Sequence, residues 1–221
     1  MAEKLSSEER VAQILLSIKA VTLNVSKPYK WASGIYAPIY CDNRIIMSHV
    51  KERREVIELM AQKAEKEIGS VNFGKICGIA TSGIPYGAWL AEKMSKPMVY
   101  VRSGEKDHGK GNRIEGELLK GDRVVMVEDL ISTGWSSLSG VLAVREKGAE
   151  CNHCMAIFTY EMEKAKSAFR DANCSLHALT NFSTLVKVAL KNNYIKKEEL
   201  QPALDWSADP QGWGAAQGLG K

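Results

Sequence analysis

Residues 124–137, VVMVEDLISTGWSS, combine an apolar run with two neighbouring acids and a segment of small polar residues. The apolar run predicts a buried strand, and Glu128 and Asp129 stand at its end, where carboxylates are costly unless a cation or hydroxyl groups meet them. The Ser, Thr and Gly residues that follow lead directly into a predicted helix. Hydroxyls and backbone N–H groups therefore converge at a helix N-terminus, which makes a phosphate cradle.

The chemistry of this run indicates a phosphorylated sugar. Its two carboxylates could accept hydrogen bonds from vicinal sugar hydroxyls, or help to hold a Mg²⁺ ion carried by phosphate oxygens. The structural alternative is a strand end whose acids merely precede a capped helix. That alternative suits an isolated acid pair better than this whole run.

Two further segments with residues suited to anion binding follow predicted strands. In residues 80–90, ATSGIPYGAWL, small residues would let backbone N–H groups approach an anion, although a tight turn explains them equally well. Residues 101–116, VRSGEKDHGKGNRIEG, form a glycine-punctuated loop. Its basic residues are Arg102, Lys106, His108, Lys110 and Arg113. Such a loop suits a lid over a polyphosphate leaving group, and the alternative is a solvated surface hairpin.

Alternating elements must position these segments. The predicted strands are residues 75–80, 97–102, 122–129, 154–160 and 175–180, and the predicted helices among them are 87–94, 136–147, 163–172 and 183–193. This alternation is typical of a mostly parallel sheet with helices on both faces. Ligands bind beyond the carboxyl ends of the strands in such sheets, which is where all three segments fall.

Outside this alternation, the sequence predicts further elements near the N-terminus and a glycine-rich C-terminal tail. Ser6 and Glu9 form a capping box for an N-terminal helix, residues 31–47 predict strand–turn–strand, and 49–68 predict a surface helix. The tail from residue 207 is Gly-rich, and its last residues are expected to be mobile. We find no linker or repeat and expect one domain over residues 1–221.

Composition narrows the function classes. The net charge of +4 over 221 residues is mild, so it does not demand nucleic acid, and the tryptophans form no stacking platform for bases. Five cysteines, an odd number without a framework, indicate a reducing compartment. Because no apolar run is long enough to cross a bilayer, we expect a cytoplasmic protein without a membrane partner.

The histidines and a cysteine pair are weaker candidates. Cys151, His153 and Cys154 resemble half of a metal site, but no second pair stands at zinc spacing. Alternation along a strand predicts the two cysteines on opposite faces, which favours core packing over metal binding. His49 and His177 have no ligand cluster near them in the sequence and are expected to be structural.

Taken together, the motifs resemble those of the type I phosphoribosyltransferases, and of the orotate phosphoribosyltransferases in particular. VVMVEDLISTG resembles the phosphoribosyl-diphosphate motif, and YVRSGEKDHGKGNRIEG is similar to the catalytic loop. WASGIYAPIYCDNR resembles the hood segment on the orotate side, and TSGIPYGAWLAEKMSKPMVYVR is also similar to that family. The resemblance covers roughly residues 10 to 214.

The resemblance implies an α/β fold of the type I phosphoribosyltransferase kind, with a mostly parallel sheet flanked by helices. A small N-terminal hood would span about residues 20–47 and a mobile catalytic loop about 103–116. The implied catalytic residues are Lys106, His108, Glu128 and Asp129. The implied contacts to phosphoribosyl diphosphate are Arg102, Lys106, His108, Glu128, Asp129, Leu130, Ile131, Ser132, Thr133, Gly134, Trp135 and Ser136, and Ser132 would also lie near orotate.

The implied reaction joins phosphoribosyl diphosphate to orotate and gives orotidine 5′-monophosphate and diphosphate, a step of pyrimidine biosynthesis. Mg²⁺ would arrive with the substrate and not on a resident metal site, and the enzyme would be a homodimer whose loop reaches the neighbouring site. Two alternatives remain. One is transfer to another base. The other is a non-catalytic sensor of phosphoribosyl diphosphate that binds RNA or DNA, which would not need Lys106 and His108 and should show a basic face.

Some positions depart from the family's pattern. Ser103 stands where some members have a second lysine, Trp135 where a small residue is usual, and Tyr36 and Ala37 where Lys and Ser are frequent. No segment similar to DRQERG follows the predicted strand 154–160, and residues 159–165, TYEMEKA, stand there instead. The group that recognises the orotate carboxylate is therefore open, with Arg44 as a candidate.

Overall fold

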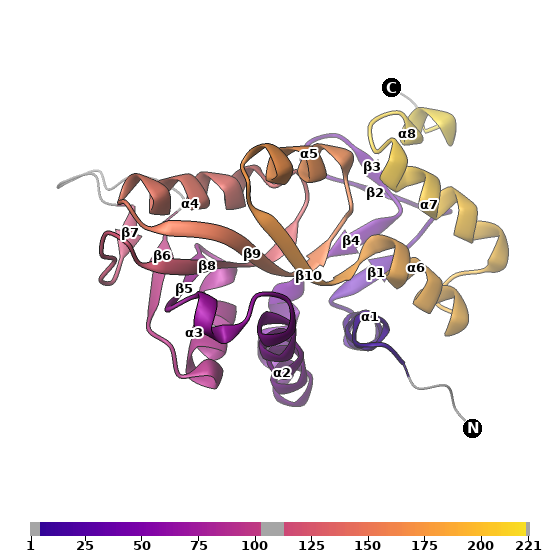
Figure 1. Ribbon diagram of the computed structural model, residues 1–221. Helices are drawn as coiled ribbons and strands as arrows, with labels where there is room; N and C mark the ends of the chain where they lie inside the picture. The colour runs from indigo at the N-terminus through magenta and orange to yellow at the C-terminus, as the bar shows by residue number, and fades with distance from the viewer. Residues whose placement is uncertain (1–4, 103–112, 220–221) are drawn as a thin grey trace.

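A central sheet organises the computed structural model of the protein, which describes residues 5–102 and 113–219 (Figure 1). Within the described residues the sheet has six strands in the order β10-β9-β8-β5-β6-β7. They are β5 (Lys75–Ile79), β6 (Met98–Val101), β7 (Ile114–Glu115), β8 (Arg123–Ile131), β9 (Glu150–Thr159) and β10 (Ser175–Asn181). Neighbours pair in parallel except β7, which is antiparallel to β6. The expected mostly parallel α/β sheet is confirmed, and β7 is a strand within the predicted loop.

Helices cover both faces of this sheet (Figure 1). One face carries α4 (Trp135–Glu146) and α5 (Glu163–Asp171), and the other carries α1 (Ser7–Ser17), α2 (Val50–Glu67) and α3 (Gly83–Met94). The chain continues through α6 (Phe182–Lys191), α7 (Leu200–Ala208) and α8 (Trp213–Ala216), with short 3₁₀ helices at Ser70–Asn72 and Lys197–Glu199. The predicted capping box opens α1, with Ser6 Oγ accepting from Glu9 N at 3.2 Å.

The core divides into two apolar layers, one on each side of the sheet. Val125 and Val127 of β8 pack in the layer with α1, α2 and α3, and Val124 and Met126 pack in the layer with α4 and α5. This division follows from the alternation of side chains along a strand. A strand apolar on both sides must be central, and β8 lies between β5 and β9.

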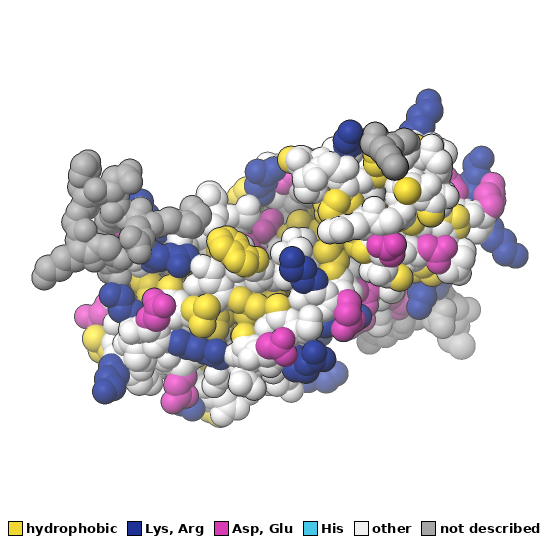
Figure 2. Space-filling view, turned by 90° about the horizontal axis from the view of Figure 1, so that it is seen from above, with side chains coloured by type: hydrophobic (Ala, Val, Ile, Leu, Met, Phe, Trp, Pro, Cys, Tyr) yellow, Lys and Arg dark blue, Asp and Glu magenta, His cyan; other side chains and the backbone are white. Residues whose placement is uncertain are grey.

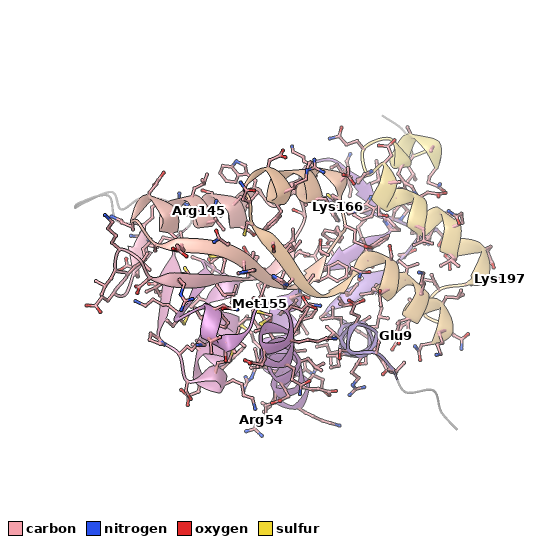
Figure 3. All side chains as sticks on the ribbon, viewed as in Figure 1. Glu9, Arg54, Arg145, Met155, Lys166 and Lys197 are labelled. Carbon is pink, nitrogen blue, oxygen red and sulfur yellow. The ribbon has the colours of Figure 1, made fainter. Side chains whose placement is uncertain are left out.

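An irregularity in β9 corrects the expectation for the cysteine pair. Cys151 and Cys154 are both fully buried and both lie in the layer beneath α4 and α5, on the same side of the sheet. Pairing shifts from Arg123↔Glu150 to Val125↔His153, so β9 holds one extra residue there and the alternation breaks. Arg145, labelled in Figure 3, donates from Nη2 to the Cys151 carbonyl at 2.8 Å and so binds the irregular backbone.

The N-terminal hood consists of two small antiparallel sheets. One pairs β1 (Val21–Leu23) with β4 (Ile39–Cys41), and the other pairs β2 (Tyr29–Lys30) with β3 (Tyr36–Ala37). The predicted strand up to residue 47 is wrong, since a 3₁₀ helix runs over Asn43–Ser48. Asp42 caps it by accepting from the backbone N–H of Arg44 at 3.2 Å.

The C-terminal helices, which the Gly-rich tail did not predict, hold the hood from outside. Trp206 of α7 is fully buried and donates from Nε1 to the carbonyl of Tyr36 in β3 at 3.0 Å. Trp213 opens α8 and donates from Nε1 to the Pro202 carbonyl at 2.7 Å. Trp206 therefore connects α7 to the hood, and Trp213 connects α8 to α7.

The surface carries charges of both signs. On the face drawn in Figure 2, Lys and Arg side chains are interspersed with Asp and Glu instead of forming one block. Across residues 5–102 and 113–219, no helix has both the length and the apolar character needed to cross a membrane.

Candidate active site

The acid pair lies near the carboxyl end of β8. Glu128 is only 6% exposed, and Asp129 is half-buried. The strand continues to Ile131, two residues beyond its predicted end at 129, because Leu130 and Ile131 still pair with Phe158 and Thr159 of β9. The backbone N–H of Asp129 donates to Glu128 Oε1 at 3.1 Å, and both acids line the same cavity.

Both carboxyl groups titrate abnormally. Burial raises the pKa of Glu128 far above its ordinary value of 4.5, and the Asp129 carboxylate raises it further. Burial also raises the pKa of Asp129. In the part of the chain that the structure describes, neither acid has an ion-pair partner. Burial therefore favours the protonated form of the pair, and a ligand that pairs with the carboxylates would favour the charged form.

A cavity of about 360 Å³ joins three parts of the chain at these acids. Its lining residues come from the hood, from the turn after β5 and from β8 with the loop that follows it. They are Cys41, Asp42, Arg44, Ala80, Thr81, Ser82, Glu128, Asp129, Leu130, Ser132 and Ser136. The segment after β5 lines the same cavity as the acids. From the sequence, a tight turn without a binding role was an equally good interpretation of this segment.

The segment Ser132–Ser136, predicted to be a phosphate cradle and called the cradle loop below, runs from the end of β8 into the first turn of α4. Gly134 is the N-cap, and no side chain caps the helix, so the first N–H groups of α4 have no side-chain acceptor. Gly134 has φ +80°, and a Cβ there would lie 2.9 Å from the Phe169 ring. Trp135 is 78% exposed, so its indole does not pack into the core. The side chain of Ile131 is buried, and only its backbone can face a ligand.

Close backbone packing places α3 against the acid strand. A Cβ at Gly83 would lie 2.4 Å from the Val127 carbonyl and 3.3 Å from Cα of Glu128. Only glycine allows this approach. For this reason α3 begins at Gly83, four residues before the predicted start at 87, and brings Thr81 and Ser82 into the cavity.

Asn43 is a site residue that the sequence reasoning missed. It is completely buried, and its Nδ2 donates to the Asp129 carbonyl at 2.7 Å. Its own carbonyl accepts from the Tyr86 hydroxyl of α3. Asn43 thus ties the hood, α3 and the acid strand together at one point. The available signal was a carboxamide next to the charged residues of the hood motif YCDNR.

The remaining predicted residues differ in what can be said of them. Arg44 lines the cavity, but its guanidinium is held by Asp42 through two bonds of 2.7 and 2.9 Å. Arg102 lies at the end of β6, with Nη1 3.8 Å from a carboxylate oxygen of Glu115. Lys106 and His108 lie outside the described residues.

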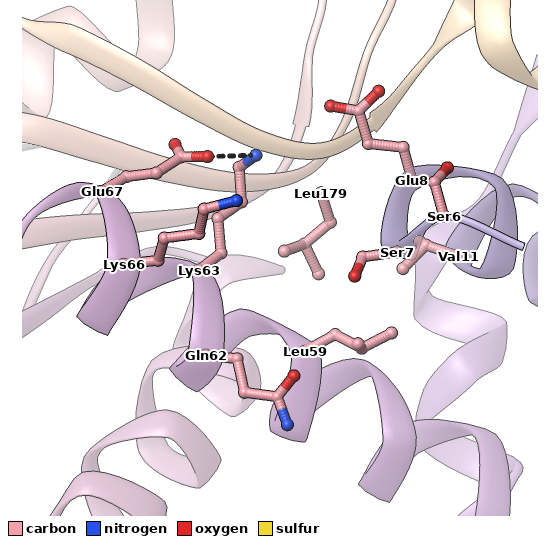
Figure 4. A pocket seen from close by; sticks show the side chains of 10 residues that line it. All are labelled: Ser6, Ser7, Glu8, Val11, Leu59, Gln62, Lys63, Lys66, Glu67 and Leu179. Carbon is pink, nitrogen blue, oxygen red and sulfur yellow. Dashed lines mark ion pairs between the residues drawn. The ribbon is translucent and has the colours of Figure 1, made fainter.

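A hollow away from the acids has a different character (Figure 4). It measures about 330 Å³, lies between α1 and α2, and shares no lining residue with the acid cavity. Lys63 and Glu67 on its rim are paired at 2.8 Å. Glu67 also meets His177 at 2.8 Å, and His177 meets His153 at 3.1 Å, so His177 joins α2 to the sheet. Among the residues described, no group of three potential ligands could hold a metal ion.

Comparison with known proteins gives a consistent family. Residues 45–191 match the model of the phosphoribosyl transferase domain. A protein named orotate phosphoribosyltransferase from Coxiella burnetii is 49% identical over 203 residues, 92% of this chain and 96% of the relative. One with the same name from Listeria innocua is 47% identical over 210 residues, 95% of this chain and all of the relative. The crystal structure of orotate phosphoribosyltransferase from Aeropyrum pernix superimposes with a TM-score of 0.73 at 25% identity, covering 84% of this chain and 99% of that one.

Proposed function

Because the chain belongs to the orotate phosphoribosyltransferase family, we propose that it transfers the 5-phosphoribosyl group from phosphoribosyl diphosphate to orotate, giving orotidine 5′-monophosphate and diphosphate. The observation that carries the proposal is the acid pair, without a cationic partner among the described residues, in the same cavity as the uncapped first turn of α4. A ligand with vicinal hydroxyls near a phosphate satisfies both features at once.

The acids and the cradle divide the work on the ribose. The 5-phosphate binds the N–H groups and hydroxyls between Ser132 and Ser136, which fixes the sugar. Glu128 and Asp129 accept hydrogen bonds from the ribose hydroxyls. As the bond from C1 to the diphosphate oxygen breaks, its electron pair leaves with diphosphate and the ring becomes cationic. Two buried carboxylates beside the ring stabilise that developing charge.

The other half of the reaction forms the new bond and neutralises the leaving group. A ring nitrogen of orotate attacks C1 with its electron pair, and the proton that this nitrogen loses passes to the departing diphosphate. Arg102 lies at the start of the basic loop and is suited to meet the diphosphate, together with Lys106 and His108 as the family resemblance implies. Stabilising the leaving charge is the main electrostatic task of that loop.

Mg²⁺ fits this arrangement as an ion that binds together with the substrate. Two neighbouring carboxylates with phosphate oxygens are a donor set that Mg²⁺ accepts, and it seldom requires a cage made only of protein groups. Glu128 and Asp129 would hold it together with the substrate, where it would neutralise phosphate charge.

An orotate assay tests the proposed function. Loss of orotate absorbance in the presence of phosphoribosyl diphosphate and Mg²⁺ is expected, with no turnover when uracil or a purine replaces orotate. Consumption of another base but not of orotate would replace this proposal with transfer to that base. Binding of phosphoribosyl diphosphate without turnover of any base would favour a sensor.

We also propose a homodimer in which each catalytic loop serves the partner's site. The test mixes two nearly inactive variants, Lys106→Ala and Asp129→Asn, and lets their subunits exchange. With a shared loop, a heterodimer has one site with both defects and one with neither, so activity returns to about half the wild-type level per heterodimer. If heterodimers form, as judged by native mass spectrometry, and no activity returns, the loop serves its own subunit.

The proposed setting is the cytoplasm, and the proposed organisation is one phosphoribosyltransferase domain over residues 1–221. All five cysteines are free thiols, and four of them are buried, which suits a reducing compartment. The indole bonds from α7 and α8 support the single-domain proposal, because they connect the end of the chain to the hood and to the preceding helix.

A further inference from the structure

A second cavity borders the acid cavity on the hood side. It measures about 390 Å³ and lies between the hood, the start of α5 and the segment after α7. Ser132 lines both cavities, so they are neighbours at the beginning of the cradle loop. A substrate that fills the acid cavity and continues past Ser132 would therefore reach this one.

The walls of this second cavity suit a flat polar ring. Trp31, Ile35 and Met162 supply apolar surface, and Ser33, Thr133 and Ser207 supply hydroxyls. Trp31 is held in place: its Nε1 donates to the Ile39 carbonyl at 3.2 Å, and its ring lies 5.1 Å from that of Tyr160 and 5.4 Å from that of Trp206. Cavities of this size with apolar walls and a few fixed polar groups are typical of small-molecule sites.

One cation faces this space. Lys164, in the first turn of α5, is the only Lys or Arg among the described residues that line the cavity, and it forms no ion pair with any of them. The neighbouring acid Glu163 also lines the cavity, but one of its carboxylate oxygens lies 3.7 Å from Nζ of Lys166. Arg44, the cation that the sequence offered, lines the other cavity and is occupied by Asp42.

We propose that Lys164 pairs with the carboxylate of the base and is the residue that selects orotate over a base without that group. The inference rests on the proposed function. It gives a role to TYEMEKA, the segment in which this chain departs from the family's pattern. Because the ammonium group is solvent-exposed until the base covers it, its effect on affinity is moderate and specific to the charged substituent.

The test compares two nucleotides that differ only in this carboxylate. Orotidine 5′-monophosphate and uridine 5′-monophosphate are titrated calorimetrically into wild type, Lys164→Gln and Lys164→Arg. Lys166→Gln is the matched control, since Lys166 is on the same helix, exposed, and not part of the cavity wall (Figure 3).

We expect Lys164→Gln to weaken the binding of orotidine 5′-monophosphate about fivefold to tenfold and to leave the affinity for uridine 5′-monophosphate unchanged. Lys164→Arg and Lys166→Gln should keep the wild-type preference. In turnover, the KM for orotate should rise by a similar factor in Lys164→Gln, while the KM for phosphoribosyl diphosphate stays within about twofold.

An unchanged preference in Lys164→Gln overturns the proposal, and so does equal weakening of both nucleotides. The proposed function is judged separately, by whether wild type consumes orotate. If wild type turns over orotate but Lys164→Gln keeps its preference, only the carboxylate assignment falls. If Lys164 selects the carboxylated nucleotide but wild type consumes no orotate, the assignment stands and the proposed reaction falls.

Discussion

Charged residues lie at the amino ends of the central strands β5 and β8 and near the carboxyl end of β8, and the surroundings of the charges differ between the two ends. At the amino end, Lys75 is 8% exposed, and its Nζ lies 2.7 Å from Asp122 and 2.6 Å from the Glu117 carbonyl. Asp122 also accepts from the backbone N–H of Leu119 at 2.8 Å, and the bond from Lys75 lowers its pKa. At the carboxyl end, the pKa values of Glu128 and Asp129 are raised by burial.

This difference separates a structural charge from a functional one. Where a buried charge has its partner in the protein, removing that partner destabilises the fold, because the remaining charge is left uncompensated. Buried acids without such partners oppose folding, and proteins keep them where a ligand supplies the missing hydrogen bonds or positive charge. Lys75 begins β5 and Asp122 directly precedes β8, whereas Glu128 and Asp129 lie near the carboxyl end of β8. Substitutions at the two ends should therefore have different consequences.

The largest effect is expected from removing the charge of one acid. Asp129→Asn should lower kcat/KM about a thousandfold, because the carboxylate acts on charge that develops in the transition state. The fold should remain, because Asp129 forms no ion pair with any described residue that the substitution would break. Steady-state kinetics with a thermal melt as the folding control measures both. A well-folded Asp129→Asn protein with near-normal kcat/KM would remove the acid pair from the mechanism.

At the amino ends of β5 and β8, a substitution should lower stability and leave activity nearly unchanged. Lys75→Met should lower the free energy of unfolding by about 2–3 kcal/mol, because it leaves Asp122 partly buried without its cation. The kcat/KM of the folded protein should stay within about twofold. Urea unfolding and kinetics on the same sample check the pair of values. The double variant Lys75→Met/Asp122→Asn should recover part of the loss, and no recovery would mean that the ion pair is not the cause.

The smallest effect is a gain in stability at the acid pair. Glu128→Gln should raise the free energy of unfolding by about 1–2 kcal/mol at pH 8 while lowering activity, as expected where function keeps a strained group. The gain should appear only as the pH rises above the ordinary value of 4.5. In that range folded wild type keeps a proton that its unfolded chain has lost, so wild-type stability falls with rising pH.

The amino end should show the opposite pH dependence. The pKa of Asp122 is lowered in the folded protein, so its contribution is present above the ordinary value of 3.8 and disappears as the pH falls through the lowered value. Asp122→Asn should thus destabilise at pH 7 and cease to matter in acid. Urea unfolding of both variants between pH 3 and pH 8 tests the contrast, which fails if their differences from wild type follow the same trend.

The part of the site that could be predicted from the sequence consists of residues that are adjacent along the chain. Glu128, Asp129 and the Ser132–Ser136 cradle follow one another along the chain, so a strand, a turn and a helix start place them without further information. This prediction depends only on short-range geometry.

Contacts between distant segments could not be predicted in the same way. Asn43 reaches Asp129 across 86 positions of the sequence, and no local pattern relates them. The extra residue in β9 that places Cys151 beside Cys154 depends on pairing with β8. The contact of Trp206 with the hood and the position of Lys164 beside Ser132 likewise depend on how remote elements pack.

Calorimetric titration with Mg²⁺ and phosphoribosyl diphosphate measures most directly whether the ligand, and not the protein, neutralises the acid pair. At pH 7.5, above the second ionisation of a phosphate near about 6, titrations in buffers of different ionisation enthalpy count the protons released on binding. Wild type should release close to one more proton per site than Glu128→Gln, because ribose hydroxyls and the cation favour the charged pair. Equal proton release by the two proteins, with phosphoribosyl diphosphate bound to both, would contradict the assignment of these acids to the substrate.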